Sequence, residues 1–446
     1  MSNLQRFHTL EFVFMMILSG ILICPAYAEE TQVAVTINCA DTYSWISLAG
    51  FLHGHYVATD DQIRRLSVGY WRDPPIERFP KMKQLGIEAS IGFAYLVKEG
   101  KDYNARMVTA ENSAAYVRYI KDRYNAVSEA EKKYNYRVKY WEFWNEPEGM
   151  YVWEPQTKGK PDVKMERLFY AFKIFYDTMR ELKPDALIVA PSSCHFWPEL
   201  MEDFIKRCNE NKIRLDAIAW HVIDCQPHEI PKQVEFVRRL IKKYPSIGVK
   251  EIHLNEFGWP NIGAGSQMGY FYYMGKSRVD LATKSIWGYE PIDNLITSEG
   301  VPRVSYWAWE YYGKISPKGF DVKSNNPFVV GLAGTDKKNR DTIRIILART
   351  TVAKRYSSDP GPPIPAIPPI ASPVNVSLLV MNMPDGKKSI EIVSLPNTDY
   401  SLSEDVRKSF ISQTEQVAAN GKILLAFPHM EEEKVFLVTI QPAEKN

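Results

Sequence analysis

The stretch YWEFWNEPEG, from Tyr140 to Gly149, is the most informative segment of this chain. It begins like a buried strand, with four aromatic side chains among its first five residues, and it stops at Asn145-Glu146-Pro147. Proline lacks a backbone N–H, so it cannot continue a central strand. The segment therefore predicts an apolar strand that ends on an amide and a carboxylate.

Similar short apolar runs recur along the chain and alternate with longer amphipathic segments. Parallel strands need a crossover connection, which a helix supplies. Eight strand–helix units over roughly 250–300 residues match the size of a (β/α)8 TIM barrel, so we expect an α/β fold of that type. An open, doubly wound sheet is the alternative, but it usually carries a Gly-rich phosphate loop that is not visible here. The predicted strands are one within 33–51 and then 66–71, 87–96, 140–146, 186–193, 215–223, 251–260 and 303–313.

A proline-rich stretch, 357–373, interrupts this pattern with seven prolines in seventeen residues. Such a segment cannot continue a helix or a central strand, so it predicts a linker. Beyond it lie short β-rich runs, with Asp385-Gly386 and Asn420-Gly421 as hairpin turn signals. We therefore expect a catalytic barrel over 29–356 and a small C-terminal β-sandwich domain over 374–446.

The N-terminal residues 1–28 have the features of a signal peptide. Arg6 precedes an apolar run, and Ala26-Tyr27-Ala28 fits the small-x-small cleavage rule. This predicts a secreted or periplasmic protein without membrane association after cleavage, and an uncleaved anchor is the alternative. Lys plus Arg number 55 and Asp plus Glu number 53, without a block of like charge, so no nucleic-acid partner is expected.

Four cysteines follow the predicted signal peptide. Their even number permits disulfides in an oxidising compartment, and buried thiols are an equal alternative. They lack the tight spacing of metal ligands, so we predict neither a metal nor another cofactor. The four are Cys39, Cys194, Cys208 and Cys225.

Polar side chains mark the predicted C-terminal ends of several strands. Glu146 ends the fourth strand, His221 the sixth, Glu256 the seventh and Glu310 the eighth. In a parallel barrel these ends meet at one rim, where active sites lie. Two carboxyls there can cleave an acetal. Burial and a like-charged neighbour would raise the pKa of the one that donates a proton, while the other, ionised, attacks the anomeric carbon or activates water.

Three segments, WEFWNEP, LNEFGWP and SYWAWEYYG, resemble the fourth, seventh and eighth strands of clan A glycoside hydrolases, which are retaining (β/α)8 enzymes. The first is most similar to the xylosidase and iduronidase group, family 39, and the second fits the cellulase and mannanase group, family 5, equally well. The resemblance implies that Glu146 is the acid/base and Glu256 the nucleophile. It also implies that Asn145 binds the sugar 2-hydroxyl and that His221 lies near the nucleophile.

The chain departs from this pattern at two places. Ile223 stands where the clan often has a tyrosine, and Arg72 is only a loose match to its second-strand arginine. Further candidates are less specific. Glu142 could point into the barrel either as a hydrogen-bonded structural carboxylate or as an outer partner of the site. Aromatic candidates for the sugar cleft are Trp307, which we favour as the floor of a subsite, Trp309, Tyr95 and Trp259.

The sequence thus predicts a retaining O-glycoside hydrolase that acts on a polysaccharide or oligosaccharide through two glutamates. Two alternatives remain open. One is a catalytically silent barrel that only binds carbohydrate. The other is a transglycosylase of the same fold, which would differ in how the acceptor side excludes water.

Overall fold

The computed structural model describes most of the chain between Thr31 and Ala443. The predicted signal peptide, most of the proline-rich segment and the candidates Tyr95 and Trp259 lie outside the described residues. None of the helices described is long and apolar enough to cross a membrane. The described residues are 31–44, 50–52, 58–94, 108–147, 161–223, 225–258, 262–284, 294–351 and 373–443.

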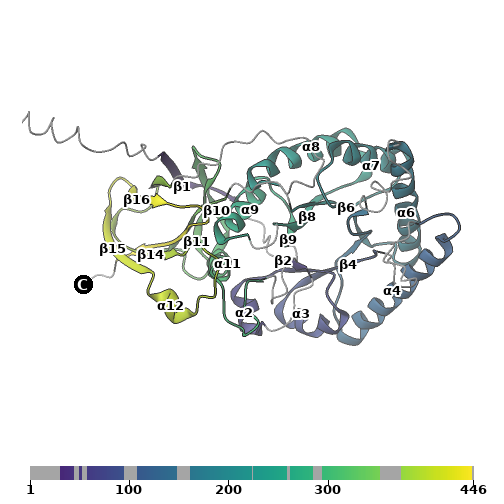
Figure 1. Cartoon of the computed structure of the whole chain (residues 1–446), viewed down its shortest axis with the longest axis horizontal. Helices are drawn as coiled ribbons and strands as arrows, with labels where there is room; N and C mark the ends of the chain where they lie inside the picture. Colours follow the sequence, from purple (N-terminus) through teal and green to yellow (C-terminus); the bar gives the residue numbers. More distant parts are fainter. Residues whose placement is uncertain are drawn as a thin grey trace, which may run out of the picture.

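Eight parallel strands form a closed barrel, and helices surround it (Figure 1). The last strand pairs back with the first, since Lys284 lies beside Phe51. The predicted barrel is therefore confirmed, including its number of strands. In chain order the strands are β2 (Gly50–Leu52), β3 (Tyr70–Arg72), β4 (Glu88–Gly92), β5 (Tyr140–Glu142), β6 (Leu187–Ser193), β7 (Ala217–Val222), β8 (Glu251–Phe257) and β9 (Leu281–Lys284).

The helices between these strands are amphipathic, and their apolar faces pack on the outside of the barrel. In α8, for example, Val234, Val237 and Leu240 are buried at helical spacing. The described helices are α2 (Asp60–Arg65), α3 (Phe79–Leu85), α4 (Ser113–Tyr134), α6 (Pro161–Leu182), α7 (Pro198–Glu210), α8 (Ile230–Lys243) and α9 (Ala264–Lys276).

Strand β5 explains why the opening segment is so aromatic. Side chains alternate between the two faces of a strand. Trp141 packs outward against the rings of Phe93 and Tyr124, at centroid distances of 5.9 and 5.3 Å. Tyr140 lies inside the barrel in a small apolar cluster, and Glu142 lies one layer above it. The other members of that cluster are Tyr70, Val189, Ala217, Ala219 and Leu281.

A nine-stranded sheet stands beside the barrel and contains strands from three parts of the chain. The C-terminal strands were expected, but β1 and β10–β12 come from the range predicted for the barrel. In β1 the buried side chains are Val33, Val35 and Ile37, which face the sheet core with a period of two. The strands are β1 (Gln32–Ser44), β10 (Ile315–Ser324), β11 (Val329–Asp336), β12 (Ile343–Arg349), β13 (Val374–Met381), β14 (Gly386–Leu395), β15 (Ile411–Ala418), β16 (Ile423–Met430) and β17 (Val435–Pro442).

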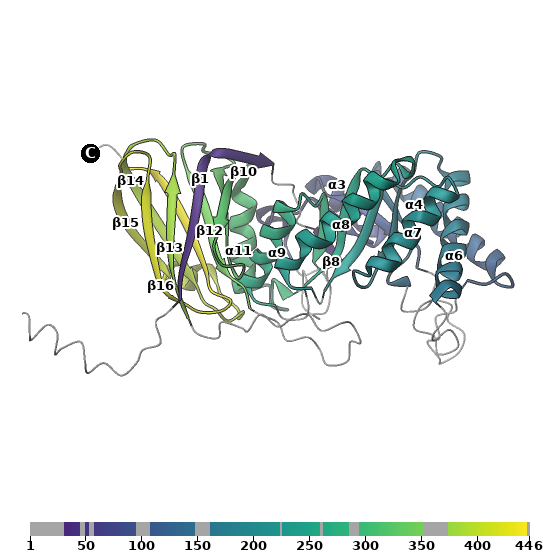
Figure 2. The same ribbon diagram turned by 90° about the horizontal axis from the view of Figure 1, so that it is seen from above.

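The prediction of a strand at 303–313 is wrong, because this segment forms helix α11 (Val304–Lys314). The eighth barrel strand is instead β9, which lies between the ranges predicted for the seventh and eighth strands. Helix α11 is buried on every side from Val304 to Gly313, since it lies with α9 between the barrel and the nine-stranded sheet (Figure 2). A helix buried on all sides has no amphipathic period, so pattern alone cannot separate it from a buried strand.

Candidate active site

The candidate catalytic side chains come from four barrel strands and meet at their C-terminal ends. Arg72 is the last residue of β3, His221 lies near the end of β7, and Glu256 is the penultimate residue of β8. Glu146 follows β5 after a tight bend and has a backbone φ of 51°, in the left-handed region. Its N–H donates to Ser192 O at 3.0 Å, which ties the bend to the end of β6.

His221 lies between the two glutamates and is fully buried. Its Nδ1 is 3.1 Å from Glu146 Oε1, and its Nε2 is 3.7 Å from Glu256 Oε1. One carboxylate oxygen of each glutamate and one ring nitrogen of His221 all lie within 4.8 Å of one another. The structure therefore brings together three of the residues predicted from strand-end positions.

Arg72 connects the site to the interior of the barrel. Its Nη1 donates to Glu256 Oε1 at 2.7 Å and to the Asn255 carbonyl at 3.2 Å. Its Nη2 donates to Asn145 Oδ1 at 2.8 Å and to Glu142 Oε1, and its Nε donates to both oxygens of Glu142 at 3.0 Å. All five guanidinium N–H groups are used, a pattern that the single ammonium of lysine cannot reproduce.

Glu142 is a buried, hydrogen-bonded carboxylate that also contacts the site through Arg72. Its side chain is 1% exposed, and Asn255 Nδ2 donates to it at 2.6 Å. Asn255 Nδ2 is in turn 3.0 Å from Ser192 Oγ, at the end of β6. Glu142 is therefore a buried, hydrogen-bonded carboxylate, and Arg72 connects it to Glu256.

The pKa of Glu146 differs in direction from our expectation. Burial acts to raise this pKa, but the hydrogen bond from His221, the charge of its imidazole and a hydrogen bond from Cys194 outweigh burial and lower it. The pKa of Glu142 is also lowered, because Arg72 more than offsets the cost of burial. A raised pKa for the acid/base residue, expected from burial and a like-charged neighbour, is therefore not what the structure shows.

The two tryptophans of α11 are not at a strand end. Trp307 Nε1 donates to Leu402 O at 2.7 Å, and the guanidinium carbons of Arg65 and Arg407 lie 5.4 and 4.7 Å from its ring centre. Trp307 is only 3% exposed, so its ring is not available as the floor of a sugar subsite.

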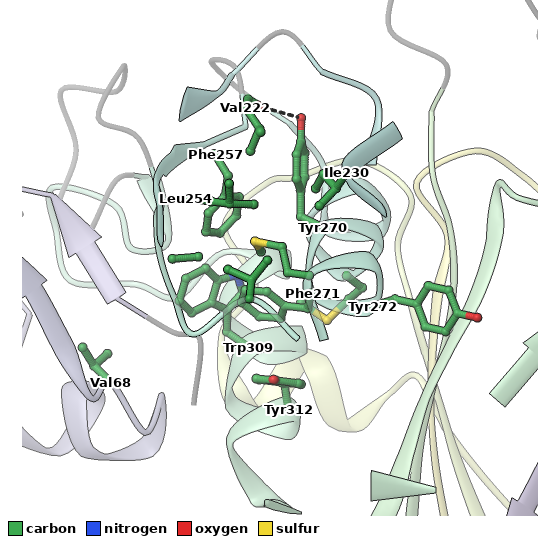
Figure 3. Packing of buried hydrophobic residues seen from close by; sticks show 14 of the residues in the cluster. Val68, Val222, Ile230, Leu254, Phe257, Tyr270, Phe271, Tyr272, Trp309 and Tyr312 are labelled. Carbon is green, nitrogen blue, oxygen red and sulfur yellow. Dashed lines mark hydrogen bonds between the residues drawn. The ribbon is translucent and has the colours of Figure 1, made fainter. Parts of the chain in front are cut away.

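Trp309 is a core residue. It packs with Phe257 and Phe271 between β8 and α9 (Figure 3), and its Nε1 donates to Gln267 Oε1 at 2.6 Å. Glu310, also predicted at a strand end, pairs instead with Arg65 at 2.8 Å. The structure therefore separates the α11 candidates from Glu146 and Glu256.

Sequence reasoning missed the contribution of the fifth barrel strand. Ser192 and Cys194 lie at and just after the end of β6, and they contact Asn255 and Glu146, respectively. The signal was present, since SSCH directly follows an apolar strand in the same way as NEP follows β5. The four cysteines in the described part of the chain are thiols and form no disulfide.

Glu146, His221 and Glu256 have the donor types and spacing that could hold a metal ion. The guanidinium of Arg72, however, already donates to Glu256 at 2.7 Å. A cation at this point would be repelled by Arg72 and would compete with it for the same oxygen. The donor set fits a pair of reacting carboxylates better than a metal centre.

No family model matches this sequence, and no curated protein matches it. Solved structures do match over nearly the whole chain, at low sequence identity. A protein of Neocallimastix frontalis matches with a TM-score of 0.68 at 16% identity and covers 93% of this chain and 100% of its own. A glucosidase of Croceicoccus marinus (0.65, 15%, 93% and 100%) and a monomeric β-xylosidase of Caulobacter crescentus (0.61, 12%, 92% and 100%) also match. The chain therefore shares its fold with these solved structures, which cover 92–93% of it.

Proposed function

We propose that this chain is a retaining O-glycoside hydrolase that works by double displacement. The observation that carries the proposal is a short separation. One carboxylate oxygen each of Glu146 and Glu256 and one ring nitrogen of His221 lie within 4.8 Å of one another. Retaining enzymes hold their two carboxyl groups about 5–5.5 Å apart, whereas inverting enzymes need about 6.5–9.5 Å to fit a water. The short separation supports direct attack by one carboxylate.

Glu256 is the nucleophile in this proposal. Arg72 holds its Oε1, so Oε2 attacks the anomeric carbon as the bond to the leaving oxygen breaks. The protonated form of Glu146 donates to that oxygen, and because the pKa of Glu146 is lowered, acidic pH favours this form. The side chain of Glu146 is also more exposed than that of Glu256, 32% against 7%, so a leaving group can reach it. The products are a glycosyl ester on Glu256, a neutral leaving alcohol and ionised Glu146.

The second step reverses these roles. Glu146 takes a proton from water, and the oxygen of that water attacks the anomeric carbon and displaces Glu256 as a carboxylate. Asn145 Oδ1 accepts from Arg72, and this contact directs the exposed amide toward the sugar, where it would bind the 2-hydroxyl. After the second step Glu146 is protonated and Glu256 is ionised, as they were at the start.

The fold and the predicted export support a proposal for the substrate class. Two proteins with this fold are a glucosidase and a β-xylosidase. Together with the predicted signal peptide, this supports a secreted or periplasmic enzyme that acts on plant or microbial polysaccharide or on oligosaccharides released from it.

The test uses the 4-nitrophenyl β-D-xyloside, β-D-glucoside and α-L-arabinofuranoside, with proton NMR of the first sugar product. We expect the anomer of the substrate to appear first. Glu256→Ala should abolish turnover, and Glu146→Ala should cleave only glycosides with activated leaving groups, because these need no acid. Initial inversion, or full activity of either variant on a natural glycan, would contradict the proposal. Binding without turnover would favour the silent barrel, and transfer to an added sugar in place of hydrolysis would favour the transglycosylase.

A further inference from the structure

We propose that Glu142 is a positioning residue that controls how Arg72 binds the nucleophile Glu256. This inference rests on the proposed function, in which Glu256 attacks the sugar. Glu142 lies one layer below the reacting groups and does not reach the cleft itself. It acts through the guanidinium that both carboxylates share.

The contacts of Arg72 are divided unequally between the two carboxylates. Glu142 receives the hydrogen bonds from Nε and one from Nη2, which together form one edge of the guanidinium. Glu256 receives only one, from Nη1 to Oε1. The side chains of Glu142 and Arg72 are 1% and 4% exposed, so water does not compete with these bonds.

This division decides which oxygen of the nucleophile can react. A guanidinium that faces one carboxylate alone tends to bind it with two parallel hydrogen bonds, which would involve both oxygens. Glu142 occupies the edge formed by Nε and Nη2. Asn145 Oδ1 and the Asn255 carbonyl take the remaining N–H groups of Nη2 and Nη1, so Arg72 binds Glu256 only through Oε1. Among the described residues, none donates a hydrogen bond to Glu256 Oε2. Glu142 thus leaves Oε2 available for the anomeric carbon.

The contact between Glu142 and Arg72 also affects the charge that faces Glu256. A full positive charge beside a carboxylate lowers its pKa by about 1–3 units and makes it a weaker nucleophile. Arg72 lowers the pKa of Glu142, and the ionised Glu142 offsets much of the positive charge that faces Glu256.

Other titratable groups face the site but do not share the guanidinium in this way. His221 and Glu146 lie on the cleft side of Glu256, and Tyr70 lies below Arg72. Lys284, on the neighbouring strand β9, pairs in register with Phe257 and its charge acts on Asp399. Among the titratable groups named here, only Glu142 shares the Arg72 guanidinium with Glu256. The other acceptors, Asn145 Oδ1 and the Asn255 carbonyl, carry no charge, so Glu142 is the residue to change.

The experiment measures the ionisation of Glu256 directly and does not need turnover. The full chain is labelled with [δ-¹³C]glutamate, and carboxyl signals are followed against pH by NMR. The Glu256 signal is the one missing from Glu256→Gln. We expect Glu142→Gln to lower the midpoint of Glu256 by about one pH unit or more. Glu142→Asp keeps the charge and should leave this midpoint closer to that of the unmodified protein.

Glu251→Gln is the matched control. Glu251 is also a carboxylate of β8, but it begins the strand, at the opposite end of the barrel, where it bonds Tyr140 and His253. Its loss should not move the Glu256 midpoint. A folded Glu142→Gln protein with the Glu256 midpoint of this control would overturn the inference.

If Glu142→Gln does not fold, a second measurement tests the inference. The signal missing from Glu142→Asp identifies Glu142 in the unmodified protein, and the inference requires it to titrate below Glu256. The opposite order would overturn it. The acidic limb of kcat/KM on the aryl glycosides should move in parallel with the Glu256 midpoint. If no glycoside is hydrolysed, the proposed function fails, while the titration still reports whether Glu142 controls Glu256.

Discussion

At the level of single residues, one guanidinium and one imidazole organise three carboxylates. Arg72 binds Glu142 and Glu256, and His221 lies between Glu256 and Glu146. The sequence pointed to Glu146, His221 and Glu256 because each ends an apolar strand. It could not show the pKa direction of Glu146, which depends on a contact between side chains of two strands that are not neighbours in the chain.

A pH profile tests the contact between His221 and Glu146. In His221→Phe the hydrogen bond and charge that lower the pKa of Glu146 are lost, while burial remains, so this pKa rises. A general acid must be protonated, so kcat/KM falls as the pH rises through its pKa. The alkaline limb of kcat/KM should therefore move to higher pH in the variant.

His253→Phe is the control for this profile. This imidazole is also buried inside the barrel, but it bonds Glu251 at 2.9 Å, away from the reacting groups. The alkaline limb of kcat/KM in His253→Phe should coincide with that of the unmodified protein. A limb that stays in place in His221→Phe, or moves to lower pH, would show that His221 does not set the ionisation of Glu146.

At the level of elements, α11 shows where sequence patterns fail. The run VSYWAWEYYG is apolar and aromatic on all sides, which favours a strand when propensity alone is considered. Its helical state is stabilised from a distance, since the Asp399 carboxylate accepts from Ser305 N at 2.8 Å at the start of the helix. Long amphipathic helices such as α4 and α6 face solvent on one side, so a helical period is visible in their sequences.

The tryptophans of α11 give a prediction that separates core from cleft. Trp309→Phe keeps most of the ring packing but leaves Gln267 Oε1 without its donor in a buried site. We expect a loss of about 1–3 kcal/mol in the free energy of unfolding, measured with urea, and an unchanged KM on the aryl glycosides. A large rise in KM with unchanged stability would instead place this indole against the substrate.

At the level of the whole molecule, the nine-stranded sheet combines strands from both ends of the chain and from the segment that follows the barrel. Strand β1 pairs with β13 and β12 pairs with β17, so β1 and β10–β12 share one sheet with the C-terminal strands (Figures 1 and 2). Two carboxylates from the sheet side also reach helix N-termini of the barrel. Asp399 does so at α11, and Glu433 accepts from Ser266 N at 2.8 Å at α9. Strand pairings over such separations leave no local signal, so sequence reasoning assigned these four strands to the barrel range.

Glu433 provides a pH test of this junction. Burial raises the pKa of its carboxyl, although Ser266 and Thr351 partly oppose this. The folded state therefore holds this proton more tightly than the unfolded chain. Its contribution to stability is complete below the ordinary glutamate pKa, about 4.3, and is lost as the pH rises through the raised value. The glutamine in Glu433→Gln cannot titrate. As the pH rises from about 4, the free energy of unfolding of this variant should therefore fall less than that of the unmodified protein.

The free energies of unfolding are measured by urea denaturation at a series of pH values. The neighbouring Glu432 gives the matched control. It lies in the same turn but accepts no hydrogen bond from the described residues. Glu432→Gln should follow the pH dependence of the unmodified protein. If Glu433→Gln does so as well, the Glu433 carboxyl does not link the two parts in the way described.

Covalent trapping of the nucleophile tests the role of Glu256 most directly. The protein is incubated with 2-deoxy-2-fluoro glycosides of xylose, glucose and arabinofuranose that carry an activated leaving group, and peptides are mapped by mass spectrometry. The fluorine slows both steps, and the leaving group restores the first, so the glycosyl ester accumulates. We predict that a sugar adduct forms on Glu256 as activity is lost. An adduct on another residue, or none on a protein that hydrolyses the corresponding aryl glycoside, would contradict the double-displacement mechanism proposed for Glu146 and Glu256.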